Sequence, residues 1–212
     1  MSSPLLLLKK GVPAALGDAL LAESKAWYAD AKRTVKIMGH VIPRDEMAVF
    51  FDGEAHDKLY RYSNHNMPTM EPTPLLEELR RLAMELGSVA GPARCELDLL
   101  VMNQYMDGKD SVGWHADDEP LIDQTAPIVS FSFNEANGAR KFYVRTTEPP
   151  ADGAKRKSAV YVLDHCDVAV MPPGMQATHQ HAIQKEPRAT GRRINLTFRA
   201  TTKHATKKRR NV

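Results

Sequence analysis

The feature that most constrains the fold is a change in hydrophobic period after the Gly91-Pro92 pair. Beyond this pair, apolar and polar residues alternate in short stretches with the period of two that strands have. Turn residues separate the stretches, and several short strands joined by turns favour a β-sandwich or a jelly roll. The expected strands are Cys95–Tyr105, Pro127–Phe133, Arg140–Arg145, Ala159–Leu163, Asp167–Met171, His179–Ile183 and Arg193–Ala200.

The residues before this pair carry a different pattern, because two stretches have apolar residues at every third or fourth position. This period predicts helices over Ala14–Ala31 and Pro74–Leu86. Between them, the β-rich stretch Val35–Phe51 predicts a pair of short strands, and the polar stretch Asp52–Pro74 predicts a long loop of the kind that often serves function. The sequence therefore predicts a mainly β protein of the α+β class, whose N-terminal helices pack on the β core.

The length of 212 residues suits one compact unit with a substantial core. Its two cysteines, Cys95 and Cys166, are too few for a disulfide framework, which favours a reducing environment. The run Leu5–Leu8 is too short to span a bilayer and follows no positively charged segment. We therefore expect an intracellular protein, cytoplasmic or nuclear, that does not bind membranes. We expect a monomer divided into an N-terminal part over residues 1–92, a β core over 93–202 and a tail over 203–212.

The tail concentrates positive charge in a chain whose net charge is only +3. Tails of this composition are typically disordered, and they attract polyanions by counterion release or act as a nuclear address. A solvated chain end without a partner has the same composition. The basic residues are Lys203, Lys207, Lys208, Arg209 and Arg210.

One short stretch of the core indicates a metal site. If Trp114–Asp117 is extended, His115 and Asp117 point to the same face, since side chains alternate along a strand. An imidazole and a carboxylate are two of the three ligands in the two-histidine, one-carboxylate triad that holds non-haem Fe(II). The spacing also arises by chance, and the third ligand has to come from elsewhere in the chain. The sequence leaves three candidates open: His165, His179 and His181.

A strand near the C-terminus places two arginines on one face. Alternation puts Arg193, Asn195 and Arg199 on the same side. If this side faces solvent, the segment is an ordinary half-buried strand. If it faces the inside of a jelly roll, the buried guanidinium groups require an anionic ligand. Asn103 and Tyr105 share a face of another strand, and together these donors suit a dicarboxylate such as a 2-oxo acid.

Five motifs in this order resemble those of the AlkB-type Fe(II)/2-oxoglutarate dioxygenases, and most closely the DNA- and RNA-repair branch of that family. The resemblance is strong from Leu97 to Phe198 and thinner from Met47 to Glu71. In one place the chain departs from the pattern, because Asn134–Gly138 is a small insertion after a strand where the family has a short turn. The motifs are Asn103-x-Tyr105, Asp110–Pro120, Ser130–Phe133, His181–Gln184 and Arg193–Arg199.

The resemblance implies a fold and a set of ligands. The fold is a double-stranded β-helix of the jelly-roll kind, with an N-terminal lid that recognises the nucleotide. The iron ligands are His115, Asp117 and His181, with His181 chosen because it opens the fourth motif. For 2-oxoglutarate, the far carboxylate is bound by Arg193 with Tyr105 and Asn195, and the iron-chelating end by Arg199 and Asn103.

The resemblance also implies an activity, the oxidative demethylation of N-alkylated bases in DNA or RNA. The reaction uses Fe(II), 2-oxoglutarate and O2, and it releases formaldehyde, succinate and CO2. Suitable bases such as 1-methyladenine and 3-methylcytosine are cationic, so aromatic faces and a nearby carboxylate favour them. The base has to leave its duplex or be single-stranded to reach the iron. The residues expected to contact substrate are Phe50, Phe51, Tyr62 and His115 as stacking partners, Glu119 as the acid that faces the base, and Met38 as an apolar wedge.

Two other functions fit parts of the same pattern. A related oxygenase that acts on a protein or a small molecule would carry the same iron and 2-oxoglutarate ligands, because this kind of site serves many substrates. A jelly roll that had lost catalysis would bind nucleic acid only through its basic tail. The presence of the complete predicted ligand set argues against this last interpretation. For Phe50 and Phe51, a place in the core is the alternative to stacking.

Overall fold

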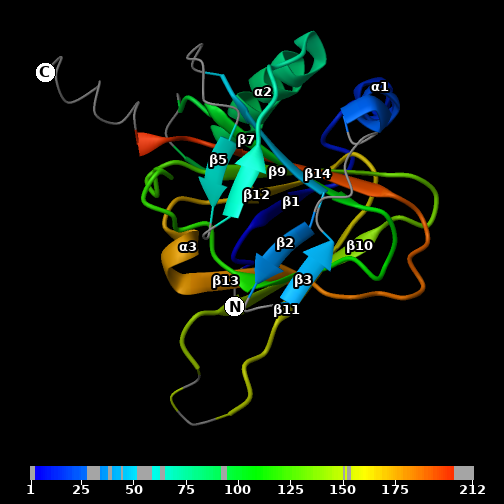
Figure 1. Ribbon diagram of the computed structural model, residues 1–212. Coiled ribbons are helices and arrows are strands. Elements are labelled where there is room, and N and C mark those ends of the chain that lie inside the picture. Colours follow the sequence, from blue (N-terminus) through cyan, green and yellow to red (C-terminus); the bar gives the residue numbers. More distant parts are fainter. Residues whose placement is uncertain are drawn as a thin grey trace, which may run out of the picture.

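The computed structural model describes residues 3–27, 34–37, 40–43, 45–51, 59–62, 65–91, 95–149, 151 and 154–202. Its architecture is mainly β and consists of two larger antiparallel sheets with helices on one side, which confirms the predicted fold class (Figure 1). Among the described residues, no helix has the length and apolarity that a membrane crossing needs. The predicted basic tail, 203–212, lies outside the described residues.

The larger sheet has six strands, and most neighbours in it are far apart in the sequence. This non-sequential order is the crossover pattern of a jelly roll. Its first strand corrects the sequence analysis, which assigned no structure to the leucine run near the N-terminus. In spatial order the strands are β1 (Leu6–Leu8), β12 (Asp167–Met171), β9 (Ile128–Asn134), β14 (Arg193–Arg199), β7 (Leu99–Tyr105) and β4 (Asp45–Phe50).

The smaller sheet has four strands and carries one side of the functional site. Two of its strands that are far apart in the sequence lie side by side, with His181 directly opposite His115. In spatial order the strands are β11 (Ala159–Leu163), β10 (Arg140–Thr146), β13 (His179–Ile183) and β8 (Val112–His115). Every strand predicted beyond Pro92 is present, with ends that differ by a few residues.

The helices α1 (Ala14–Trp27) and α2 (Pro74–Gly87) both contact β9 of the six-stranded sheet. Helix α2 begins where the sequence predicts, because Pro74 occupies its first turn and the Thr73 hydroxyl accepts a hydrogen bond from the backbone N–H of Leu76. The short helix α3 (Met175–Thr178) leads into β13. The predicted extension of the first helix to Ala31 falls on residues 28–31, which lie outside the described residues.

Two hairpins occupy the region between the long helices. One consists of β2 (Thr34–Ile37) and β3 (His40–Pro43), and the other of β5 (Leu59–Tyr62) and β6 (His65–Pro68). The second hairpin corrects the expectation of a long loop over Asp52–Pro74. The segment is polar and turn-rich, but backbone pairing between strands does not require apolar side chains, so the hydrophobic period gave no signal.

The apolar core forms two layers, one on each side of the six-stranded sheet. Alternation along β14 sends Leu196 and Phe198 to the layer beneath the helices, where they join Phe131 and Phe133. The second layer lies between the two sheets and includes Val101 and Ile128 from one sheet and Phe142 and Ile183 from the other. The intervening residues of β14, which include both arginines, therefore face the space between the sheets, and this placement excludes the solvent-facing alternative.

Candidate metal centre and anion pocket

Three potential ligands converge at the edge of the space between the sheets. Because His115 on β8 is paired with His181 on β13, their rings lie side by side, with centroids 4.2 Å apart. Asp117 follows two residues after β8, and its Oδ1 lies 3.8 Å from His115 Nε2. One ligand atom from each of the three residues falls within 4.8 Å of the others, so the group can hold a metal ion.

Neighbouring groups orient the ligands before any metal binds. His115 Nδ1 lies 2.9 Å from the carbonyl oxygen of Gly113, so that it donates there and leaves Nε2 for a metal. Asp117 Oδ2 accepts hydrogen bonds from Arg199 Nε at 3.1 Å and Nη2 at 2.7 Å. The backbone N–H of Asp117 donates to Gln176 Oε1 at 3.1 Å. These contacts leave Asp117 Oδ1 directed towards His115.

The electrostatics keep the two buried ligands in their metal-binding forms. Burial by itself raises the pKa of Asp117, but the Arg199 guanidinium and the two imidazoles outweigh it and hold this pKa well below its ordinary value. Burial, with a smaller contribution from His115, lowers the pKa of His181 to about 3. At neutral pH the site therefore presents a carboxylate and a neutral imidazole, the protonation states that metal binding requires.

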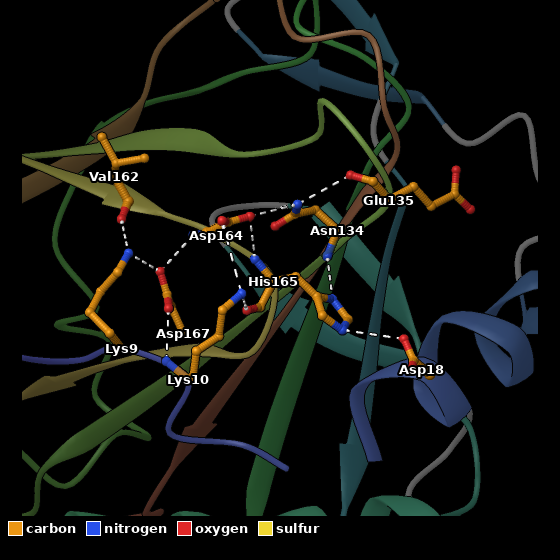
Figure 2. Close-up of polar contacts among 9 residues, drawn as sticks. All are labelled: Lys9, Lys10, Asp18, Asn134, Glu135, Val162, Asp164, His165 and Asp167. Carbon is orange, nitrogen blue, oxygen red and sulfur yellow. Dashed lines mark hydrogen bonds and ion pairs between the residues drawn. The ribbon is translucent and has the colours of Figure 1, made fainter. Parts of the chain in front are cut away.

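The structure decides among the three histidines that the sequence left open. Alternation puts His179 on the same face of β13 as His181, but His179 is the first residue of the strand, and its Nδ1 is 2.8 Å from the Thr178 hydroxyl. His165 lies in the turn between β11 and β12, where its Nδ1 accepts from the backbone N–H of Asn134 at 3.3 Å and its Nε2 is 3.5 Å from Asp18 Oδ1 (Figure 2). Only His181 of the three approaches His115 and Asp117.

A buried arginine forms an anion pocket in the same space. Arg193 is 1% exposed and donates from Nε to the Ser132 hydroxyl at 2.9 Å and from Nη2 to Asn195 Oδ1 at 2.7 Å. Its Nη1 is buried without a hydrogen-bond partner among the described residues. Burial lowers the pKa of Arg193 to about 10, which still leaves it charged at neutral pH. A buried donor of this kind is costly unless a ligand binds it, so the pocket fits a carboxylate.

One cavity joins the metal ligands to four of the five residues expected to bind 2-oxoglutarate. Its wall also includes Glu119. Glu46 and Met67 line it too, which the sequence analysis did not anticipate. The four residues are Asn103, Tyr105, Asn195 and Arg199.

Comparison with known proteins agrees with this geometry. A model of the 2OG-Fe(II) oxygenase superfamily matches residues 5–199. The chain belongs to this superfamily. Its enzymes use Fe(II), 2-oxoglutarate and O2, and the donors described above fit the metal ion and the dicarboxylate. The oxygenase shares its fold with a solved structure titled "The structure of OsALKBH1", with a TM-score of 0.63, 18% identity and coverage of 94% of this chain and 99% of that one.

Curated relatives place the oxygenase in the AlkB-type family, as its motifs predicted. The alpha-ketoglutarate-dependent dioxygenase alkB homolog 3 of Rattus norvegicus is 37% identical over 144 residues, which are 66% of this chain and 46% of the relative. The DNA oxidative demethylase ALKBH2 of Homo sapiens is 27% identical over 183 residues, which are 84% of this chain and 65% of the relative. The matches to alkB homolog 3 proteins span about half the length of those proteins or less.

A second buried arginine of the oxygenase was missed by the sequence analysis. Arg140 is 1% exposed and donates to three backbone carbonyl oxygens, those of Asp107, Asp110 and Gln184. Its guanidinium lies 5.6 Å from the Tyr105 ring centroid, and that of Arg193 lies 5.1 Å from the same centroid. Arg140 therefore fixes the loop after Tyr105 and helps to position that ring. The sequence could have indicated that Arg140 is buried, because alternation along β10 puts it on the same face as the apolar residues Phe142 and Val144.

Fewer of the residues predicted to contact substrate than of the predicted metal ligands lie at the cavity. Phe51 is not brought to the cavity, which corrects its assignment as a stacking partner. It packs beneath the helices, where its ring stacks on Phe198 at 6.3 Å and carries the Arg80 guanidinium at 5.0 Å. Phe50 packs against the apolar layer between the sheets and is absent from the cavity wall. Met38 and the side chain of Tyr62 lie outside the described residues.

Proposed function

We propose that this oxygenase demethylates N-alkylated bases in DNA or RNA, using Fe(II) held by His115, Asp117 and His181. The observation that carries the proposal is the convergence of these three ligands beside a buried arginine that has an unpaired donor. The curated relatives support the substrate class, since one is a dioxygenase of the alkB homolog 3 kind and another is named a DNA oxidative demethylase. The fold alone would not support it, because this fold serves many substrates.

We infer a binding place for each end of 2-oxoglutarate. Arg193, with Tyr105 and Asn195 beside it, binds the far carboxylate, because its unpaired Nη1 gains a charge-assisted hydrogen bond there. Asn103 and Arg199 line the cavity near the metal ligands and bind the iron-chelating end. When bound, the iron and 2-oxoglutarate supply the oxidation of the methyl C–H bond by O2.

The protein's own contribution is to fix the geometry and to exclude water. Arg199 holds Asp117 through two hydrogen bonds, so the carboxylate keeps one orientation. Both Asp117 and His181 are buried, and the apolar residues Val101, Phe142 and Ile183 complete the cavity wall. A dry, pre-organised site of this kind strengthens every charge interaction within it.

Glu119 is suited to recognise a cationic base. It lines both the cavity and a second hollow at the cavity mouth, together with His115. Burial and then the neighbouring charge of Asp117 raise the pKa of Glu119. A methylated adenine or cytosine brings a positive charge to this position and therefore interacts favourably with the carboxylate. A neutral base of the same shape lacks this interaction.

The test is a repair assay with three substrates. Single-stranded and duplex oligonucleotides that carry one 1-methyladenine are incubated with the protein, Fe(II), 2-oxoglutarate and O2, and the bases are quantified by mass spectrometry. We expect loss of the methyl group together with equimolar formaldehyde and succinate. The unmethylated oligonucleotide is the control. Succinate formation without repair would instead support an oxygenase that acts on a protein or a small molecule. The monomeric state and the intracellular location remain predictions.

A further inference from the structure

The outer surface of the four-stranded sheet carries three side chains in mutual contact that the proposed chemistry does not use. Because His115 and His181 point to the metal side, their neighbours Trp114 and Gln180 point to the opposite side. Arg145, which is paired with Gln180 in register, joins them there. Its guanidinium lies 4.0 Å from the Trp114 ring centroid, and its Nε and Nη2 donate to Gln180 Oε1 at 3.2 and 2.9 Å. We refer to these three residues as the Trp114 face.

The Trp114 face has an excess of positive charge. Within the part of the chain that the structure describes, the hydrogen bonds of Arg145 go to an amide and not to a carboxylate. Burial and then the positive charge of Arg156 lower the pKa of Arg145, so two guanidinium groups lie within Coulomb range of each other. Lys155 and Lys157 flank Arg156 on the same exposed segment. A stacked, pre-organised arginine beside a second cation is a binding arrangement for phosphate.

A hollow borders both the metal centre and this face. Its wall includes His115, Glu119, Gln176, Thr147 and Gln180. Gln180 is the residue whose amide oxygen accepts both hydrogen bonds from Arg145. A nucleic acid strand whose target base enters the cavity has to leave over its rim, and a strand that leaves along this hollow passes Gln180, which holds the Arg145 guanidinium.

We propose that the Trp114 face binds the phosphodiester backbone of a single strand next to the target base, with a phosphate at Arg145 and Arg156. This inference rests on the proposed function. Stacking on Trp114 holds the guanidinium in place, so little conformational entropy is lost when phosphate binds. The acidic residues of the hollow, which include Glu119, would then lie near the target nucleobase, and Arg145 and Arg156 would lie near the phosphate.

The test compares two lengths of single strand, each with one 1-methyladenine: a trinucleotide, and a 15-mer long enough to reach the face. Fluorescence anisotropy at several salt concentrations gives Kd and its salt dependence, and repair is followed separately. We expect Arg145→Ala to weaken 15-mer binding about fivefold, the upper range for an exposed ion pair. The slope of log K against log salt should fall by about 0.7, the value for one phosphate contact on a single strand. Binding of the trinucleotide should change little.

Three further variants sharpen the comparison. Arg145→Lys keeps the charge, so it should keep the salt slope but recover only part of the affinity, because lysine cannot stack as a plane. Arg156→Ala should shift Kd in the same direction as Arg145→Ala, and it carries the test if the latter does not fold. Arg81→Ala removes an exposed arginine of α2, a helix that packs on the other sheet, and it should bind both oligonucleotides like the unsubstituted protein.

The outcomes separate this inference from the function it rests on. If Arg145→Ala and Arg156→Ala bind the 15-mer with unchanged Kd and salt slope while the unsubstituted protein repairs it, the inference is wrong and the proposed function stands. If the unsubstituted protein repairs neither oligonucleotide, both are wrong. A selective loss of 15-mer affinity with the trinucleotide unaffected supports the inference.

Discussion

Replacing Arg193 by methionine tests the anion pocket most directly. Methionine fills a similar volume beside Tyr105 and Asn195 but removes the charge and the unpaired Nη1 donor. Truncating one partner of a buried, hydrogen-bonded charge pair costs about 2–5 kcal/mol. Taking about 3 kcal/mol, we expect the Kd for 2-oxoglutarate to rise more than about 100-fold.

This loss can be measured as a lost thermal shift, with Mn(II) in place of Fe(II) so that no turnover occurs. At a ligand concentration of about 100 times the Kd, 2-oxoglutarate stabilises the unsubstituted protein by about 2.7 kcal/mol. For a domain of this size that is a rise in Tm of about 5–11 °C. At the same concentration, Arg193→Met should gain about 0.4 kcal/mol, or about 1 °C.

A matched ligand separates the far carboxylate from the rest of the molecule. 2-Oxobutyrate keeps the metal-chelating end but lacks the far carboxylate, so it should stabilise the variant and the unsubstituted protein equally. The assignment of Arg193 would be refuted if the variant kept its full 2-oxoglutarate shift, or if it lost the 2-oxobutyrate shift to the same extent.

Three further predictions concern single side chains. His181→Ala should abolish stoichiometric Mn(II) binding in calorimetry, whereas His179→Ala should retain it; the reverse result would reassign the ligand. Gly108→Ala should lower the free energy of unfolding by at least about 1–3 kcal/mol, because the new Cβ would lie 1.7 Å from the Glu186 carbonyl oxygen. The control is Gly113→Ala, where a Cβ meets no atom within 4 Å. Equal urea midpoints for the two variants would contradict the reasoning. The pKa of Asp164 is lowered, chiefly by the hydrogen bond from the backbone N–H of His165. The charged Asp164 carboxylate therefore stabilises the fold above its unfolded-state pKa, and this stabilisation is lost on acidification below pH 3.8. In urea unfolding, Asp164→Asn should lose less stability than the unsubstituted protein between about pH 5 and pH 3, and an unchanged pH dependence would contradict this prediction.

Local sequence patterns predicted much of the fold and of the site, because strands and site motifs are formed by residues that are close in the sequence. The period of two located the strands of the core beyond Pro92 other than β8, and the same alternation placed Arg193 and Arg199 on one face. Alternation could not tell which face was buried. The second hairpin and β1 were missed for a related reason, since a strand of three or four residues pairs through its backbone and needs little hydrophobic period.

The sequence by itself determined the order of the strands, the residue types of the metal and anion sites, and the family to which they belong. Only the tertiary structure decided that His181 rather than His179 meets His115, that Phe51 lies beneath the helices, and that Arg140 is buried beside Tyr105. The physical reason is that alternation is set by neighbouring residues in the chain. Which strands pair, and in which register, is set by contacts between residues that lie far apart in the sequence.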